Sequence, residues 1–263
     1  MFKTSFKAAL LASAFAGLAA TAALADEAVV TPAPMAPAAE EPASPFTFSG
    51  TVGFTTNYMF RGLTQTQDDP AIFGSFDVGH ESGLYAGIWA SSIDFGDNPD
   101  DDANLEFDFY AGFANSINAF SYDLGAVYYM YPGADEDVAG LGEYNYWEVY
   151  AKTGYDFGLF SIGDGVYYSP EFFGEAGDAL YGFGDITIPL PFLPFDIAAI
   201  GSFGYQTFLE DNGVDDYFDY SGGLSASVLG FDMSAKYIGT LGWAGPKGEL
   251  ADDAFSFTIS RTF

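Results

Sequence analysis

Hydrophobic and polar residues alternate one for one along much of the chain from Phe46 onwards. The clearest stretch is NLEFDFYAGF at 104–113, where Phe107 and Phe109 alternate with Glu106 and Asp108. Successive side chains of a β-strand point to opposite faces, so a strand separates the two sets. A soluble sandwich would bury the aromatic face, whereas a membrane barrel would turn it to lipid and keep the acids in its lumen.

The alternation recurs and predicts about twelve strands, none of which fits helical spacing. In the first strand, one face carries Phe46, Phe48, Val52, Phe54, Tyr58 and Phe60. The predicted strands are 46–60, 71–80, 84–93, 103–114, 120–131, 144–156, 159–168, 179–188, 195–207, 216–228, 231–240 and 253–263.

The connections between these segments alternate strictly between short and long. The short ones are 81–83, 115–119, 157–158, 189–194 and 229–230. The long ones, which hold many of the acids, are 61–70, 94–102, 132–143, 169–178, 208–215 and 241–252. Membrane barrels show this asymmetry, and a soluble sandwich has no reason to. The sequence therefore predicts an all-β fold, a transmembrane antiparallel up-and-down β-barrel with short periplasmic turns and longer acidic extracellular loops.

The N-terminal residues have the features of a secretory signal peptide. Lys3 and Lys7 precede an apolar stretch, and the small residues of Ala23-Leu24-Ala25 suit a cleavage site. We therefore expect a signal peptide at 1–25, a Pro- and Ala-rich periplasmic linker at 26–45 and the barrel at 46–263. The expected location is the outer membrane of a Gram-negative bacterium, in contact with its lipid and lipopolysaccharide.

The final segment reads AFSFTISRTF. Its apolar face carries Phe255, Phe257, Ile259 and Phe263, and the last residue is aromatic. This arrangement resembles the signal by which outer-membrane barrels are inserted, which would make the barrel-assembly machinery a partner. Arg261 departs from the pattern, because an apolar residue is usual there.

Composition narrows the possible functions. The formal net charge is −30, and removal of Lys3 and Lys7 with the signal peptide lowers it to −32. Phosphate binding needs a cationic surface, so nucleic acid is excluded as a partner. Cysteine is absent, which excludes a disulfide scaffold and thiolate chemistry. Aromatic residues make up 19% of the chain, which is far too many for an acidic disordered protein.

Several motifs together resemble a known family. Residues 57–96 read NYMFRGLTQTQDDPAIFGSFDVGHESGLYAGIWASSIDFG, which resembles the N-terminal signature of the TorF family of proposed porins, also called gcw_chp proteins. The further matches, in family order, are LEFDFYAGF (105–113), YDLGAVYYMYPGAD (122–135), YNYWEVYAKTGYDF (144–157) and YYSPEFFGE (167–175). The most specific elements are Tyr-x-x-Arg-Gly and His-Glu-Ser-Gly-x-Tyr-x-Gly-x-Trp. The resemblance implies an outer-membrane barrel with porin activity and assigns no residue roles.

Catalytic and metal-binding motifs are weak. The only histidine, His80, adjoins a short turn, and a lone base without a placed nucleophile does not indicate an enzyme. The run GDNPDDDAN (96–104) lacks the glycine and the bidentate glutamate of a calcium loop, so we interpret it as a solvated acidic loop, with weak divalent binding as the alternative. We predict no enzyme activity, no metal site and no cofactor.

The lumen is the remaining candidate site. Its predicted charged residues are Glu106, Asp108, Asp123, Glu148, Lys152, Asp156, Asp232 and Lys236, with Arg61 as a further candidate. Carboxylates that line a pore favour cations. Inward Tyr110, Tyr129 and Tyr150 would narrow the lumen, and the charges could instead pair and close it. The prediction is a diffusion channel for small polar solutes that favours cations; the alternative is a plugged barrel that serves as a structural or surface-interaction protein. The oligomeric state is left open.

Overall fold

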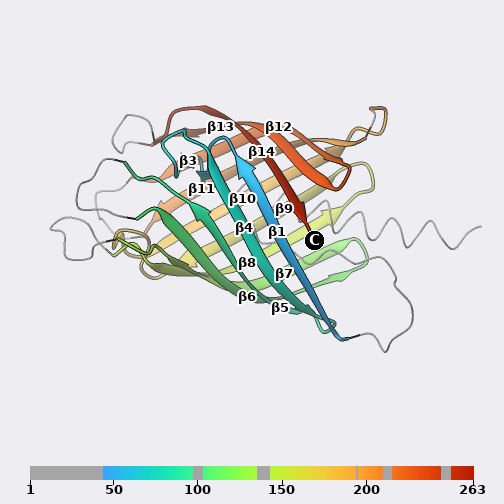
Figure 1. Cartoon of the computed structure of the whole chain (residues 1–263), viewed down its shortest axis with the longest axis horizontal. Coiled ribbons are helices and arrows are strands. Elements are labelled where there is room, and N and C mark those ends of the chain that lie inside the picture. Colours follow the sequence, from blue (N-terminus) through green and yellow to red (C-terminus); the bar gives the residue numbers. More distant parts are fainter. Residues whose placement is uncertain (1–43, 97–102, 135–142, 194, 210–214, 244–249) are drawn as a thin grey trace, which may run out of the picture.

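Twelve antiparallel strands close into one barrel (Figure 1). The computed structural model describes residues 44–96, 103–134, 143–193, 195–209, 215–243 and 250–263. The barrel strands are β1 (Phe46–Thr55), β4 (Ala71–His80), β5 (Leu84–Ser92), β6 (Leu105–Ile117), β7 (Phe120–Met130), β8 (Tyr146–Asp156), β9 (Ser161–Ser169), β10 (Ala179–Pro189), β11 (Asp196–Phe208), β12 (Tyr217–Val228), β13 (Phe231–Leu241) and β14 (Ala254–Thr262). The up-and-down barrel predicted from the alternating pattern is confirmed.

Each strand pairs with its neighbours in the sequence, and β1 closes the barrel by pairing with both β4 and β14. The seam between β1 and β14 matches Thr51–Thr55 with Thr258–Thr262. Beyond it, the amide of Phe263 donates to the carbonyl oxygen of Gly50 at 2.9 Å. Over this seam the first and last strands pair with each other and do not form free edges, as a sheet that spans lipid requires.

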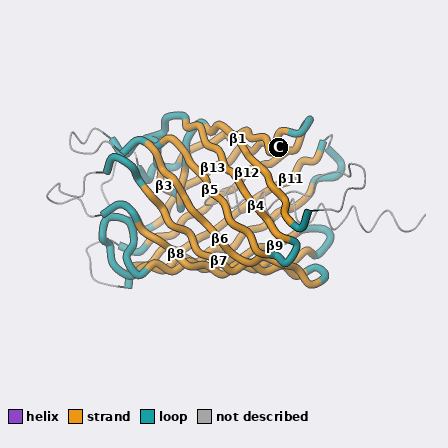
Figure 2. Tube along the Cα trace, turned by 60° about the horizontal axis from the view of Figure 1, so that its bottom comes forward, coloured by secondary structure: helices purple, strands orange, loops and turns teal. Residues whose placement is uncertain are grey.

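The connections differ at the two ends of the barrel (Figure 2). At the short-turn end, residues such as Gly83 and Gly230 have φ of +97° and +79°, which a tight hairpin requires. At the other, long-loop end the strands are joined by the longer segments, among them 93–104, 131–145 and 242–253. The predicted asymmetry of the connections is therefore present.

Phenylalanine and tyrosine are divided unevenly between the two faces of the strands. Phenylalanines are exposed on the outside, for example Phe48, Phe76, Phe109 and Phe203. Within the described residues, the buried aromatic side chains are tyrosines and Trp89 instead. The outside is therefore an apolar surface, and the inside is packed with rings that can hydrogen-bond.

The first strand is shorter than the alternation predicts. It ends at Thr55, and the chain then turns into the barrel as a small hairpin of β2 (Met59–Phe60) and β3 (Leu63–Thr64). The predicted outward placement of Tyr58 and Phe60 is wrong. Tyr58 is buried, with its ring centre 5.4 Å from that of Trp89. The period of two persists through the turn because the hairpin is itself extended, so periodicity alone could not detect it.

The signal peptide and most of the linker lie outside the described residues, which begin at Ser44 and Pro45. In the part of the chain that the structure describes, no helix has the length and apolarity to cross a membrane.

Candidate functional site in the barrel lumen

The hairpin of residues 57–66 is fixed at its base by Asn57. The Asn57 Oδ1 accepts hydrogen bonds from the hydroxyls of Thr64 at 2.7 Å and Thr66 at 3.4 Å. Its Nδ2 donates to Asp68 at 2.5 Å. The amide of Tyr58 donates to the hydroxyl of Thr66 at 3.2 Å. These bonds hold the two arms of the hairpin together at its base.

Arg61 lies at the tip of the hairpin and reaches the barrel wall. Its Nη2 is 2.6 Å from Glu148 Oε2 on β8, and its Nη1 donates to Gln206 Oε1 on β11 at 2.8 Å. Arg61 and Glu148 are each 1% exposed. The guanidinium carbon lies 4.3 Å from the ring centre of Tyr181 and 5.2 Å from that of Tyr167. The wall thus surrounds this cation with a carboxylate, an amide and aromatic faces.

The turn that presents Arg61 has no room for a residue larger than glycine at position 62. Arg61 and Gly62 both have positive φ, +45° and +79°, as in the tight turns that suit two-residue hairpins. A Cβ at Gly62 would lie 2.6 Å from Thr240 Cγ2 and 2.8 Å from Asp219 Cβ. The tip therefore touches β12 and β13 while Arg61 pairs with β8 and β11, so the hairpin spans the lumen.

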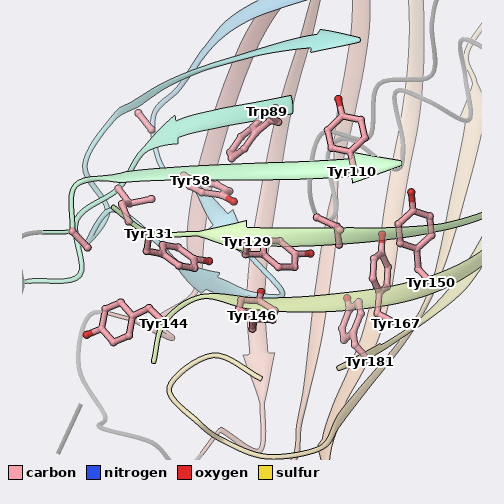
Figure 3. Packing of buried hydrophobic residues seen from close by; sticks show 14 residues of the cluster. Tyr58, Trp89, Tyr110, Tyr129, Tyr131, Tyr144, Tyr146, Tyr150, Tyr167 and Tyr181 are labelled. Atoms are coloured by element: carbon pink, nitrogen blue, oxygen red, sulfur yellow. The ribbon is translucent and has the colours of Figure 1, made fainter. Parts of the chain in front are cut away.

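Tyrosine hydroxyls bond to carboxylates around the inner wall. Tyr85 donates to Asp123 at 2.6 Å, and Tyr110 donates to Asp77. Tyr129 donates to Glu148 at 3.1 Å. Figure 3 shows such rings projecting from neighbouring strands into a shared interior space. Each of these hydroxyls gives a buried carboxylate a hydrogen-bond donor in place of water.

Tyr131, which follows β7 at the long-loop end, extends this network. Its hydroxyl donates to Glu106 Oε1 at 2.9 Å. Burial raises the pKa of Tyr131 well above its usual value, and the charge of Glu106 acts in the same direction. The phenol therefore keeps its proton and serves as a donor at neutral pH.

Glycines on the inner face leave room for the tyrosine rings. A Cβ at Gly87 would lie 2.5 Å from the ring of Tyr110 on the next strand. The small residue thus accepts the ring that its neighbour directs inward, which allows dense packing inside a narrow barrel.

The predicted site residues fall into two groups. Buried or half-buried inside the barrel, on inward-facing positions of their strands or on the hairpin, are Arg61, Glu106, Asp108, Asp123, Glu148, Lys152 and Lys236. Asp156 and Asp232 instead lie near the short-turn end. Asp156 accepts the amide of Gly158 at 2.7 Å, and Asp232 accepts the hydroxyl of Ser227 at 2.5 Å. These two acids shape the turns.

Sequence reasoning missed three inward acids, Asp77 on β4, Asp185 on β10 and Asp219 on β12. Each has the strand parity of an inward residue, so alternation within FGSFDVGH or YFDYSGG could have found two of them. The contact between Asp219 and the hairpin had no comparable signal, because it depends on how far the tip reaches across the lumen.

Lys152, like Arg61, has both aromatic and acidic neighbours on the barrel wall. Its Nζ lies 4.4 Å from the ring centre of Tyr150 and 5.0 Å from that of Tyr167. It also interacts electrostatically with Asp123. Charge is therefore distributed along the wall as well as at the Arg61 tip.

The candidates for catalysis and metal binding lie elsewhere. His80 Nδ1 is 2.9 Å from the hydroxyl of Ser82 in an exposed turn at the short-turn end. Most of the acidic run 96–104 lies outside the described residues. Across the described ranges, no group of three or more His, Cys, Asp or Glu side chains could hold a metal ion.

The terminal strand places its predicted insertion residues on the outside. Phe255, Phe257 and Phe263 are exposed and Ile259 is half-exposed. Arg261 shares that face, with its guanidinium 5.2 Å from the ring centre of Phe231 and 5.3 Å from that of Phe263. The ring contacts let this cation lie on an apolar surface near the short-turn end.

Comparison with protein families gives one match, to the family described as "Bacterial protein of unknown function (Gcw_chp)", over residues 39–263. The chain belongs to the Gcw_chp family. That span covers the whole described barrel, including the Arg61 hairpin. A search of curated protein sequences finds no match.

Among solved structures, the chain is similar to several outer-membrane proteins. CdiB from Acinetobacter baumannii has 10% identity and a TM-score of 0.46; the match covers 84% of this chain and 60% of CdiB. The outer membrane protein OpdK from Pseudomonas aeruginosa has 10% identity and a TM-score of 0.44, over 86% of this chain and 68% of that one. The COG4313 outer membrane channel from Pseudomonas putida F1 has 9% identity and a TM-score of 0.45, over 88% and 100%. All three TM-scores are below 0.5, so these structures do not indicate the function of this chain.

Proposed function

We propose that this barrel is a narrow channel of the bacterial outer membrane that passes small polar solutes and favours cations. The observation that carries the proposal is the contrast between the two faces of the closed sheet. The outside exposes residues such as Phe76, Phe109 and Leu124, which suit lipid, while carboxylates such as Asp77 and Asp108 lie inside. A closed sheet with this polarity matches the requirements of a membrane-spanning barrel.

The porin activity implied by the TorF resemblance agrees with this proposal. The apolar outside and the short-turn and long-loop ends support an orientation with the short turns in the periplasm. Lipopolysaccharide and the barrel-assembly machinery are then the expected partners. We assign no catalytic activity, since the described contacts of His80 are those of a turn residue.

The Arg61 hairpin supports a second candidate, a plugged barrel with a structural or surface-interaction role. Arg61, Tyr129 and Gln206 are almost completely buried, so side chains fill the lumen at the level of the tip. A channel of this design conducts through a tight constriction or after the tip moves. A plugged barrel would not conduct at all.

A planar bilayer recording of the refolded protein in potassium chloride separates the two candidates. Discrete current steps from the wild-type protein support the channel, and their absence supports the plug. A variant that lacks residues 58–65 is the matched control, because removal of the hairpin should leave a conducting barrel. If the deletion variant conducts and the wild-type protein does not, the hairpin is a permanent plug.

A further inference from the structure

The groups around the Arg61 guanidinium form a binding site for a cation. We call them the guanidinium seat: Glu148, Tyr167, Phe172, Tyr181 and Gln206. The guanidinium carbon lies 4.3 to 5.5 Å from the ring centres of Tyr181, Tyr167 and Phe172. Glu148 and Gln206 accept its hydrogen bonds at 2.6 and 2.8 Å. A carboxylate combined with several aromatic faces is the usual chemistry for recognition of an organic cation.

The seat belongs to the barrel wall, and Arg61 is its occupant. Glu148, Tyr167, Tyr181 and Gln206 come from β8, β9, β10 and β11, which are four successive strands of the sheet. Figure 3 shows Tyr167 and Tyr181 as adjacent rings on this wall. The seat would therefore persist if Arg61 left, and it would then hold a buried carboxylate without its cation. Such a charge is costly unless another cation replaces the first.

A further observation marks the seat as more than a structural ion pair. Asp219 on β12 interacts electrostatically with Arg61 and accepts a hydrogen bond from Tyr181. The seat therefore offers a second negative charge beside that of Glu148.

The occupant is attached in a way that permits release. Arg61 adopts a positive φ of +45°, which is unfavourable for a residue with a side chain. The hydrogen bond between Asn57 and Thr66 fixes the base of the hairpin, and these two residues are four and five positions from Arg61 in the chain. The tip can thus leave the seat while the base stays in place.

We propose that the guanidinium seat binds organic cations with a guanidinium group, which compete with Arg61 and displace the hairpin tip. The proposal rests on the proposed channel function for its transport consequence, because it names the class of solute that would open the lumen. Binding itself requires only that the seat exists. A solute that carries this group would supply the same planar donors and positive charge that Arg61 supplies now.

The first test uses Arg61→Ala, which empties the seat. Methylguanidinium chloride is titrated calorimetrically into the refolded variant in detergent, with potassium chloride at equal ionic strength as the reference. We expect binding at least about tenfold tighter than to the wild type, because a tethered side chain competes at roughly millimolar effective concentration. Arg61→Ala combined with Glu148→Gln should lose this binding. A folded Arg61→Ala protein that does not bind methylguanidinium overturns the proposal.

The empty variant need not fold unaided, since it buries an unpaired carboxylate. In that case, millimolar methylguanidinium present during refolding should raise the yield of folded barrel, whereas potassium chloride should not. Arg61→Gln, which keeps much of the side-chain length, is put through both assays in parallel. The absence of binding and of refolding rescue in both variants overturns the proposal.

Calorimetry also separates this inference from the channel function. If methylguanidinium binds but wild-type protein passes no current in bilayers, the binding site is supported and the channel function is contradicted. If the wild type conducts but neither variant binds methylguanidinium, the channel function is supported and the binding site is contradicted. Conduction of wild-type protein that rises when methylguanidinium replaces potassium supports both.

Discussion

At the scale of single residues, a hydroxyl group favours an inward position for an aromatic side chain, although Phe73 and Phe183 also pack inside and Tyr128 is exposed outside. The inner wall offers carboxylates, and Tyr85, Tyr110 and Tyr129 donate to them. Phenylalanine has no donor for such a partner, and its exposed positions include Phe48, Phe76 and Phe203 on the outside. A buried phenol without a partner would be penalised, whereas a phenyl ring on the lipid side is not.

Strand parity predicts these placements well. The alternation in NLEFDFYAGF puts Glu106, Asp108 and Tyr110 inside and Phe109 outside, as the structure has them. The partner of each hydroxyl could not be predicted, because it depends on the register between strands. Tyr85, for example, bonds to Asp123, which lies two strands away on β7.

Depth in the membrane should decide the cost of an outward charge. Leu124 lies outside, midway along β7, and is 53% exposed, so Leu124→Arg should destabilise the barrel by about 2–4 kcal/mol. Leu84 is similarly exposed at the short-turn end, where Leu84→Arg should cost roughly 0–1 kcal/mol, as the outward Arg261 already suggests. Urea unfolding in lipid vesicles measures both. Equal losses of stability would contradict the proposed membrane orientation.

At the scale of elements, the hairpin is the feature that sequence reasoning did not find. Asn57, Tyr58, Arg61 and Gly62 belong to the family-like stretch NYMFRG, and each has a separate part in it. Asn57 fixes the base, Tyr58 packs on Trp89, and Gly62 permits the turn that presents Arg61. The residues were visible in the sequence, but the inward turn depends on space inside a closed barrel.

Gly62 controls how closely the tip approaches the wall at β12 and β13. Gly62→Ala should clash with Thr240 and Asp219, displace the tip and raise single-channel conductance. The matched control is Gly158→Ala, because Gly158 also has a positive φ, +84°, but no neighbour within 4 Å of the added carbon. Both changes should cost roughly 1–2 kcal/mol in backbone strain. If the two variants conduct alike, the hairpin is not the constriction.

The last strand allows a test of the insertion signal apart from stability. The described contacts of Phe263 are backbone hydrogen bonds to Gly50 and the guanidinium of Arg261, so its side chain adds little to the fold. Phe263→Ala, which keeps the backbone hydrogen bonds to Gly50, should therefore lower the amount of assembled barrel in cells while export continues. Quantification of heat-modifiable protein in outer-membrane fractions measures this. Refolding of the same purified variant into detergent should be close to wild type; a comparable loss there would mean that the residue acts through stability.

At the scale of the whole molecule, negative charge exceeds positive charge inside the barrel as well as over the chain. The inward acids on the described strands are Asp77, Glu106, Asp108, Asp123, Glu148, Asp185 and Asp219, and the cations in the same space are Arg61, Lys152 and Lys236. Sequence alternation predicted the sign of this excess but underestimated it. Confinement within the sheet leaves these charges less screened by salt than those of the outer loops.

The charge excess predicts the selectivity of the channel. Wild-type protein in a salt gradient should give a reversal potential that favours potassium over chloride, and the preference should grow as salt is lowered, because the Debye length exceeds about 8 Å only below physiological ionic strength. The double variant Glu106→Gln with Asp108→Asn should weaken the preference, since it removes two buried carboxylates while it keeps their size. Asp232→Asn is the matched control, because Asp232 is exposed near the short-turn end and should change selectivity little at physiological salt. A preference for chloride in the wild-type protein, or an effect of Asp232→Asn as large as that of the double variant, would contradict selection by the buried carboxylates.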